Sequence, residues 1–215
     1  MSCPPDRRLS PAELLRLWVK YTARIPTRFA LGTAQHESNL CPSSVTKGDQ
    51  KDGSSSDGLY QLSFSPNAEG TLRALYPLAN LLDAEDNTKL FVAVCERRLD
   101  DILKWSGRTL ENATPDVWAY LGMAHNMGPG ATKKTIEQYG LNWAAYKARN
   151  PALAFVAKAY GDDVITGGRL WTPGLDAILP DYDNPPDLRK EVAGRSLVGS
   201  ILLFLGAVLI IDALS

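Results

Sequence analysis

Apolar residues recur with helical spacing through the first three quarters of the chain, which predicts a mainly α fold. The spacing predicts helices over about residues 10–23, 26–39, 87–103, 115–126, 131–138 and 151–160. The first begins at Ser10, which together with Glu13 has the spacing of a capping box. Asn87 is the expected N-cap of the longest helix, and Gly140 and Gly161 are expected to end the last two.

The helical pattern is interrupted between residues 43 and 58, where Ser, Gly, Asp and Lys dominate. This composition predicts a long surface loop. The next residues, Gly58-Leu-Tyr-Gln-Leu62, are apolar again. They predict a short strand or extended segment that returns against the helix over 26–39.

The C-terminal part of the chain has two further patterns. Residues 162–195 begin with a stretch rich in Gly, Pro and Asp, which predicts a connector after a domain over 1–161. Residues 196–211 carry no charge, and a helix continued to residue 214 would extend about 28 Å, close to the thickness of a bilayer core. We expect a membrane-spanning helix there; a core or oligomer-packing helix is the alternative.

Composition and charge narrow the classes of partner. Lys plus Arg number 23 against 24 for Asp plus Glu, so the chain has no overall field that favours nucleic acid. The cysteines Cys3, Cys41 and Cys95 are odd in number and lack metal-site spacing. We expect three thiols without a disulfide, with Cys95 buried on a helix. The sequence predicts no metal and no other cofactor, because it contains no phosphate-cradling glycine loop.

Glu37 is the candidate for chemistry. It is predicted in the last turn of a mostly apolar helix and faces the polar loop over 43–58. Desolvation in such a place favours a carboxyl group that keeps its proton, which is what cleavage of a glycosidic bond requires of an acid catalyst. By spacing alone, a Glu beside Ser38 and Asn39 near a helix end is more often a solvated or capping residue.

Glu37 belongs to the first of four motifs that follow one another along the chain. They are Ala34-Gln-His-Glu-Ser-Asn-Leu40, Gly58-Leu-Tyr-Gln-Leu62, Ala124-His-Asn-Met-Gly-Pro-Gly130 and Phe155-Val-Ala-Lys158. Their order resembles that of the lytic transglycosylases and the related goose-type lysozymes over about residues 27–160. The resemblance implies a lysozyme-like helical domain in which a small extended segment lines the cleft.

The same resemblance implies an activity and a set of site residues. The activity is cleavage of the β-1,4 bond between N-acetylmuramic acid and N-acetylglucosamine in peptidoglycan, with Glu37 as acid/base. The implied substrate-binding residues are Ser38, Tyr60, Gln61, His125, Asn126 and Phe155.

Some positions depart from the family pattern. Tyr60 stands where the family often has Met, Met127 where it has Ala, and Phe155 where it has a Tyr near the catalytic carboxyl. His125 replaces a Tyr, either as a polar contact in the cleft or as a helix-end residue that favours the carbonyl dipole. We expect His36, next to Glu37 in the sequence, to be structural or on the surface.

Two outcomes of cleavage stay open. We favour lytic transglycosylation, which needs one carboxylate. An inverting lysozyme is the alternative and needs a second one, for which Asp57 is the best candidate, while Asp49 and Asp52 lie on the same loop. The sequence is also compatible with an enzyme that acts on chitin-like glycans and with a structural protein that has lost catalysis.

Two features of the sequence bear on where in the cell the protein is expected to lie. The N-terminus lacks the apolar run of a secretory signal, so we expect no signal peptide. Arg189, Lys190 and Arg195 precede the apolar tail and would place the main domain on the cytoplasmic side, away from a wall substrate. Delivery by a phage particle or secretion apparatus would resolve this conflict, with residues 196–214 attaching the chain to a membrane, envelope or virion complex.

Overall fold

The computed structural model describes residues 3–48, 52–65, 72–150, 154–172 and 175. Contacts divide the chain into two units, Met1–Pro180 and Asp181–Ser215, and all described residues belong to the first. Within these residues, no helix is both long enough and apolar enough to cross a membrane. The helix expected over 196–214 lies outside the described residues.

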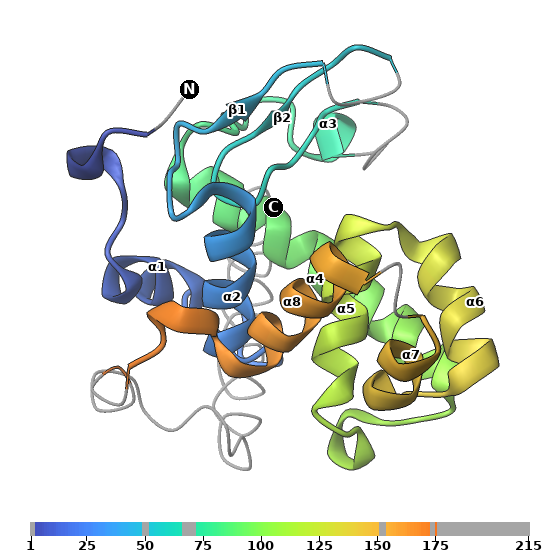
Figure 1. Ribbon diagram of the computed structural model, residues 1–215. Coiled ribbons are helices and arrows are strands. Elements are labelled where there is room, and N and C mark those ends of the chain that lie inside the picture. The colour runs from blue at the N-terminus through green and yellow to red at the C-terminus, as the bar shows by residue number, and fades with distance from the viewer. Residues whose placement is uncertain (1–2, 49–51, 66–71, 151–153, 173–174, 176–215) are drawn as a thin grey trace, which may run out of the picture. The chain divides into compact units, whose positions relative to one another are not determined.

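The described part of the chain is mainly helical, as predicted (Figure 1). Its elements are η1 (Pro5–Arg7), α1 (Pro11–Trp18), α2 (Thr27–Ser38), β1 (Val45–Thr46), β2 (Ser56–Asp57), α3 (Leu72–Leu75), α4 (Ala84–Ser106), η2 (Leu110–Asn112), α5 (Asp116–Asn126), α6 (Pro129–Tyr139), α7 (Trp143–Arg149), α8 (Ala154–Thr166) and η3 (Gly168–Leu170). Helix α8 packs against both α2 and α5, and α5 also packs against α4.

A cluster of aromatic rings forms the centre of the core where α1, α2 and α4 meet. Phe91 on α4 stacks on Tyr60 with 4.1 Å between ring centroids. Trp18 and Phe29 lie 6.1 Å from Phe91, also between centroids. All four side chains are fully buried, and each therefore contributes on the order of 2–3 kcal/mol through removal of apolar surface from water.

Helix α1 begins as the sequence predicts but ends earlier. The capping box is present: Ser10 N–H donates to Glu13 Oε2 at 2.8 Å, and Glu13 N–H donates to Ser10 Oγ at 3.3 Å. The helix ends at Trp18 rather than near residue 23. Trp18 Nε1–H donates to Ile25 O at 2.9 Å, so the residues between them turn back toward the core.

The expected N-cap of α4 is wrong. The helix begins at Ala84, and Asp83 caps it by accepting hydrogen bonds from Glu85 N–H and Asp86 N–H. Asn87 lies inside the first turns and is fully buried. An Asn at the start of an apolar periodicity is typical of a cap, but here its side chain bonds to another segment.

The expected end of the last helix at Gly161 is also wrong, because α8 continues to Thr166. A side chain at position 161 would bring Cβ within 2.0 Å of Trp143 Cζ2. Gly161 therefore allows the ring of Trp143, on the unpredicted helix α7, to lie on α8. The boundary expected after residue 161 falls within this helix.

The polar stretch over 43–58 contains the only two strands of the described residues, paired as a small antiparallel hairpin. Val45 pairs with Asp57, and Thr46 with Ser56. The following segment, residues 58–62, is a tight turn rather than a strand, and it is closed by backbone bonds between Asp57 and Leu62. The hairpin is thereby tied directly to the buried Tyr60.

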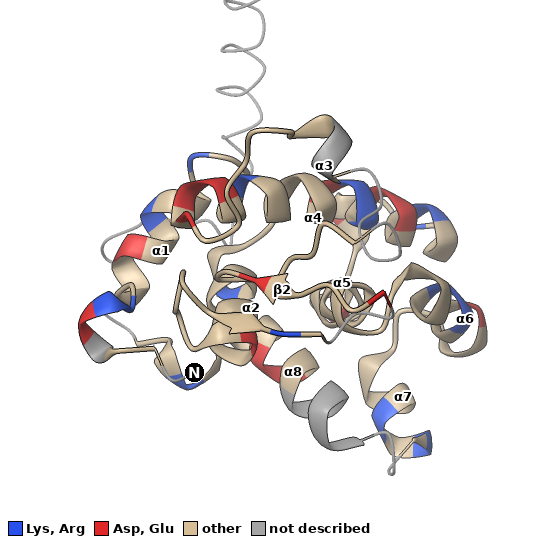
Figure 2. Cartoon of the chain, turned by 90° about the horizontal axis from the view of Figure 1, so that it is seen from above, with Lys and Arg blue, Asp and Glu red and all other residues tan. Residues whose placement is uncertain are grey.

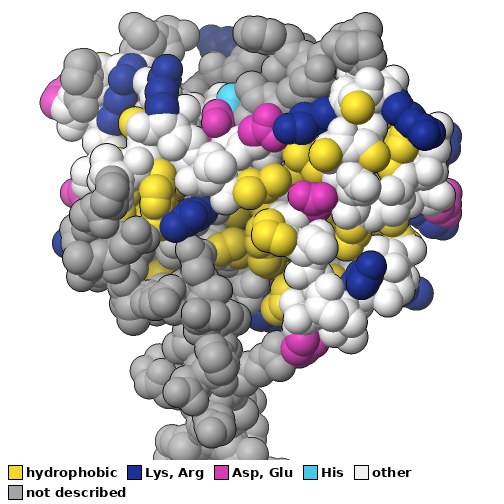
Figure 3. All heavy atoms as spheres, turned by 60° about the horizontal axis from the view of Figure 1, so that its bottom comes forward, with side chains coloured by type: hydrophobic (Ala, Val, Ile, Leu, Met, Phe, Trp, Pro, Cys, Tyr) yellow, Lys and Arg dark blue, Asp and Glu magenta, His cyan; other side chains and the backbone are white. Residues whose placement is uncertain are grey.

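The described surface carries charges of both signs. Figure 2 shows acidic and basic residues side by side along α1, α4 and α6. Arg24 forms ion pairs with Glu96 and Asp100 of α4. On the face shown in Figure 3, hydrophobic side chains form a patch bordered by acidic and basic ones.

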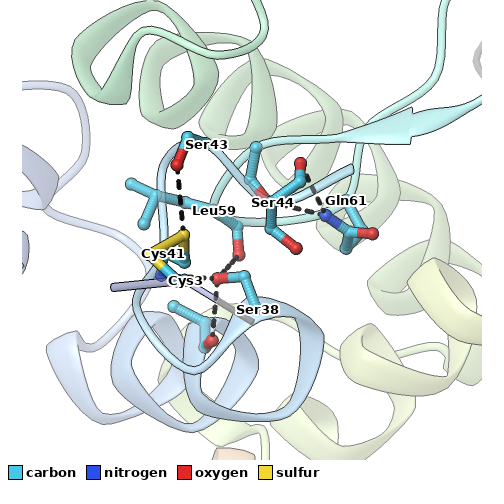
Figure 4. The surroundings of a disulfide bond; sticks show 9 residues. Cys3, Ser38, Cys41, Ser43, Ser44, Leu59 and Gln61 are labelled. Atoms are coloured by element: carbon cyan, nitrogen blue, oxygen red, sulfur yellow. Dashed lines mark hydrogen bonds between the residues drawn. A yellow bond between two sulfur atoms is a disulfide. The ribbon is translucent and has the colours of Figure 1, made fainter. Parts of the chain in front are cut away.

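A disulfide joins Cys3 to Cys41, contrary to the expectation of three thiols (Figure 4). The two Cα atoms are 5.9 Å apart although 38 residues separate them in the sequence. Only the folded chain brings them together, because the backbone leaves α2 through left-handed residues at Asn39 and Leu40. Leu9 N–H donates to Leu40 O at 3.0 Å beside the disulfide. Cys95 is a buried thiol on α4, as expected.

The disulfide predicts a redox-dependent stability. Closing a loop of this length stabilises a fold by about 4 kcal/mol, so Cys3→Ser should lower the midpoint of thermal unfolding by about 10 °C. Dithiothreitol should lower the midpoint of the wild-type protein to that of the variant and leave the variant itself unchanged. Equal midpoints for oxidised wild type and Cys3→Ser would contradict the prediction.

Candidate functional site

Glu37 lies in the last turn of α2, where the sequence predicts it. Its side chain is 16% exposed, so the carboxylate is mostly removed from water but keeps an opening to the surface. Beyond Ser38 the helix ends because Asn39 adopts the left-handed conformation, with φ of 53°. Glu37 is therefore held on a regular helix immediately before the chain turns away.

Tyr160, on α8, brings a buried hydroxyl beside Glu37. Burial raises the pKa of Tyr160 well above its ordinary value, and the negative charge of Glu37 raises it further. The hydroxyl is thus neutral throughout the physiological range. The sequence directed attention to Phe155 instead; that position lies on α8, and its side chain is outside the described part of the chain.

Two glycines allow α8 to approach this closely. A Cβ at Gly32 of α2 would lie 2.3 Å from the carbonyl oxygen of Asp163. A Cβ at Gly122 of α5 would lie 2.9 Å from Cε1 of Tyr160. Both contacts are too short for any side chain, so α8 lies against its neighbours at the level of Tyr160 only because these positions are glycine.

His36 is structural, as expected. Its Nε2 contacts the carboxylate of Asp163 on α8, and its ring lies 5.1 Å from that of Tyr160 between centroids. It therefore faces the α2–α8 contact and supports the tyrosine that lies beside Glu37.

His125 lies in the last turn of α5 and reaches the site from the opposite side. Its Nε2 is 2.9 Å from the carbonyl oxygen of Tyr60 and 3.5 Å from Oε1 of Glu37. Burial lowers the pKa of His125 to about 3, and the charge of Arg98 adds to this shift. The imidazole is therefore neutral near pH 7.

These contacts decide between the two interpretations of His125. A neutral imidazole does not act as the positive charge at the carbonyl end of α5. Arg98 has that role, since its Nη1 donates to the carbonyl oxygen of Ala124 from within the core. His125 is instead a polar contact of the site.

The turn over 58–62 contributes its backbone rather than its side chains. The ring of Tyr60 is fully buried on Phe91, so the prediction that it lines a sugar cleft is wrong for this conformation. Gln61 uses its side chain within the hairpin: Nε2–H donates to Gly58 O at 2.9 Å, and Oε1 accepts from Thr46 Oγ1 at 2.6 Å. The ring of Tyr60 therefore belongs to the core, and the side chain of Gln61 holds the hairpin together.

Asn87 holds this turn in place, a role that the sequence does not reveal. Its Oδ1 accepts from Tyr60 N–H at 3.0 Å, and its Nδ2 donates to Asp57 O and Leu81 O at 3.0 and 2.9 Å. Position 58 must be glycine beside it, since φ is +82° and a Cβ would lie 2.2 Å from Asn87 Nδ2. Asn87 on α4 therefore fixes the position of this turn, and with it the position of the Tyr60 carbonyl oxygen that contacts His125 Nε2.

Ser38 and Asn126 differ in their surroundings. Ser38 Oγ donates to Leu59 O at 2.9 Å and accepts from Cys41 N–H at 3.1 Å, so it ties the end of α2 to the turn (Figure 4). Asn126 is exposed at the end of α5. It lines a small hollow together with Gly122, Met123, Met127 and Tyr160. The hollow therefore adjoins the tyrosine that lies beside Glu37.

The loop carboxylates fall into separate roles. Asp52 accepts hydrogen bonds from Ser65 Oγ, Ser54 Oγ and Ser54 N–H, which lower its pKa, so it serves the local turn. Asp57 lies on β2, is partly exposed, and directly precedes the turn over 58–62. Asp49 lies outside the described residues. No group of three potential metal-binding side chains occurs in the part of the chain that the structure describes.

No protein-family model, no curated protein and no solved structure matches the chain. Any assignment of function therefore depends on the motifs and on the geometry around Glu37.

The position of Asn87 predicts a large effect of its removal. Asn87→Ala leaves one amide and two carbonyl groups in the interior without their hydrogen-bond partner, so the free energy of unfolding should fall by about 3–5 kcal/mol. Urea denaturation monitored by circular dichroism measures this loss. Asn112→Ala, which removes one exposed capping bond to Thr109, is the control and should cost about 1 kcal/mol. Equal losses for the two variants would contradict the assigned role.

Proposed function

We propose that the protein cleaves the β-1,4 glycosidic bond between N-acetylmuramic acid and N-acetylglucosamine in peptidoglycan, with Glu37 as the acid/base catalyst. The observation that carries this proposal is a mostly buried carboxyl group at a helix end, placed between the neutral donors Tyr160 and His125. The order of the four motifs along the chain agrees with this function. We also propose that the helical domain is lysozyme-like.

The surroundings of Glu37 suit a group that gives up a proton and takes one back. Partial burial disfavours the charged form of a carboxyl group, so such a group holds its proton more readily than one in water. The two neighbours described above can donate hydrogen bonds without bringing a positive charge, which would stabilise the carboxylate strongly. A carboxyl group held in this way can act first as acid and then as base.

One carboxylate is sufficient for lytic transglycosylation. The proton of Glu37 passes to the bridging oxygen, the bond from that oxygen to the anomeric carbon breaks, and the N-acetylglucosamine side leaves as an alcohol. The hydroxyl of the same muramic acid residue then attacks the anomeric carbon, assisted by its N-acetyl group. The carboxylate of Glu37 accepts the proton of that hydroxyl, which yields an anhydro ring without consuming water.

Tyr160 can supply the hydroxyl group that Phe155 lacks compared with the family pattern. The resemblance implies a tyrosine near the catalytic carboxyl, and Phe155 lacks that hydroxyl. Tyr160 offers a hydroxyl beside Glu37 from the same helix, at a position further along α8 than Phe155. Catalysis by Glu37 therefore does not depend on position 155 for this group.

Hydrolysis is the second candidate, favoured by the position of Asp57. An inverting enzyme holds a water molecule between two carboxyl groups that are roughly 6.5–9.5 Å apart. Asp57 lies at the end of the hairpin beside the turn that contacts His125. A structural protein without activity is the third candidate, and it predicts no product from folded protein.

The Cys3–Cys41 disulfide supports action in an oxidising setting, where peptidoglycan lies, because disulfides persist there and are rare in a reducing cytoplasm. We propose that residues 196–214 attach the chain to a membrane or to an envelope or virion complex. The reaction requires no cofactor.

The test of the proposed function is mass spectrometry of soluble fragments released from purified peptidoglycan by the full chain. Wild-type protein should release anhydromuropeptides, and Glu37→Gln should lower their yield at least about 10³-fold, because an amide has no proton to give. Glu137→Gln, on the exposed face of α6, is the matched control and should keep full activity. Activity of Glu37→Gln near that of wild type would refute the assignment.

Asp57→Asn separates the two chemistries. Reducing-end products together with a rate loss of about 10²-fold or more in this variant would establish hydrolysis with Asp57 as the second carboxylate. We expect anhydro products and a rate within about threefold of wild type, since the transglycosylase route needs Glu37 alone. Thermal unfolding of the variant checks that the hairpin stays folded.

A further inference from the structure

We propose that His125 is a positioning residue that holds the carboxyl group of Glu37 as a neutral hydrogen-bond donor, with one N–H shared between Glu37 and the carbonyl of Tyr60. This inference deepens the proposed function and rests on it. It assigns His125 to the orientation of the acid, and it excludes roles as a proton carrier or as a counter-ion.

The contact with Tyr60 decides which ring nitrogen carries the proton. A carbonyl oxygen can only accept a hydrogen bond, and it lies 2.9 Å from Nε2 of His125. Nε2 therefore carries the hydrogen. In the neutral ring Nδ1 then carries a lone pair, and this atom is buried with no hydrogen-bond partner among the described residues. A buried nitrogen without a hydrogen bond lowers the free energy of unfolding. Such groups are common at functional sites.

The ring is fixed by its packing. The side chain of His125 is only 9% exposed, and its ring meets Phe91 edge-on with 4.8 Å between centroids. Nε2 consequently stays 3.5 Å from Oε1 of Glu37, slightly beyond an ordinary hydrogen bond. Oε1 of Glu37 therefore lies next to the N–H that the Tyr60 carbonyl accepts, and it becomes the stronger acceptor when the acid loses its proton. The N–H can then strengthen its contact with Oε1 and leave Oε2 to face the glycan.

Burial and the charge of Arg98 keep His125 neutral among the groups that surround it. Glu37 faces it from α2, Arg98 from α4 and the carbonyl of Tyr60 from the turn, while Tyr160 of α8 lies beside Glu37. Burial and Arg98 disfavour a second proton on the ring more strongly than the Tyr60 carbonyl favours it. A neutral donor orients Glu37 without the strong stabilisation of its carboxylate that a cation would provide.

The first test compares two substitutions in the full chain, with Glu37 intact. His125→Gln keeps a neutral N–H donor, so cleavage of peptidoglycan should stay within about fivefold of wild type. His125→Phe fills the space without a donor and should lower kcat by about 10²-fold with little change in KM. The pH–rate profile of wild type should lack a limb near pH 6–7, where an ordinary histidine titrates.

Two results would overturn the proposal. One is full activity of His125→Phe. The other is a limb near pH 6–7 in the wild-type profile that disappears in His125→Gln, because such a limb belongs to a histidine that changes its charge during the reaction. Thermal unfolding of both variants shows whether either has lost its fold, and the comparison is made at a temperature where both are folded.

A second measurement does not depend on catalysis. The chain has only two histidines, so ring ¹⁵N signals of the full chain can be assigned with His36→Gln. The His125 signals should show a neutral ring with hydrogen on Nε2 from pH 8 to about 4. Hydrogen on Nδ1, or protonation near pH 6, would refute the proposal. Absence of cleavage by wild-type protein would instead refute the function of Glu37 while the ring signals still report the state of His125.

Discussion

The close approach of α8 to α2 and α5 is the constraint on which the site depends. Positions 32 and 122 have no space for a side chain, because backbone atoms of α8 and the ring of Tyr160 occupy it. This packing buries the hydroxyl of Tyr160 and brings it to the carboxyl group of Glu37. Larger residues at either glycine would push α8 outward and remove one of the two neutral donors.

Helix α4 organises the other half of the site through three buried side chains. Asn87 holds the turn over 58–62, Phe91 supports the rings of Tyr60 and His125, and Arg98 binds the carbonyl end of α5. Each of these residues acts at a distance from Glu37. Together they determine where the carbonyl of Tyr60 and the imidazole of His125 lie, and hence what surrounds the carboxyl group of Glu37.

The chemistry proposed for Glu37 is suited to its two described neighbours, which are both neutral. A carboxyl group that must protonate a leaving oxygen and then recover a proton is served by donors that carry no net charge. Tyr160 and His125 are both kept neutral by burial, and each is further biased by a neighbouring charge, of Glu37 and of Arg98 respectively. The disulfide at the end of α2 adds covalent restraint to the same region.

The sequence by itself determined the mainly helical class, the capping box at Ser10 and the place of Glu37 in the last turn of α2, because these depend on residues within one or two turns of each other. Tertiary structure decided the rest. Cys3 meets Cys41, Asn87 meets Tyr60 and Tyr160 meets Glu37 across long separations in the chain, and local periodicity carries no information on such meetings. Gly161 illustrates the difference: by local rules a glycine ends a helix, but a tryptophan ring from another helix lies on this one, and α8 continues through it.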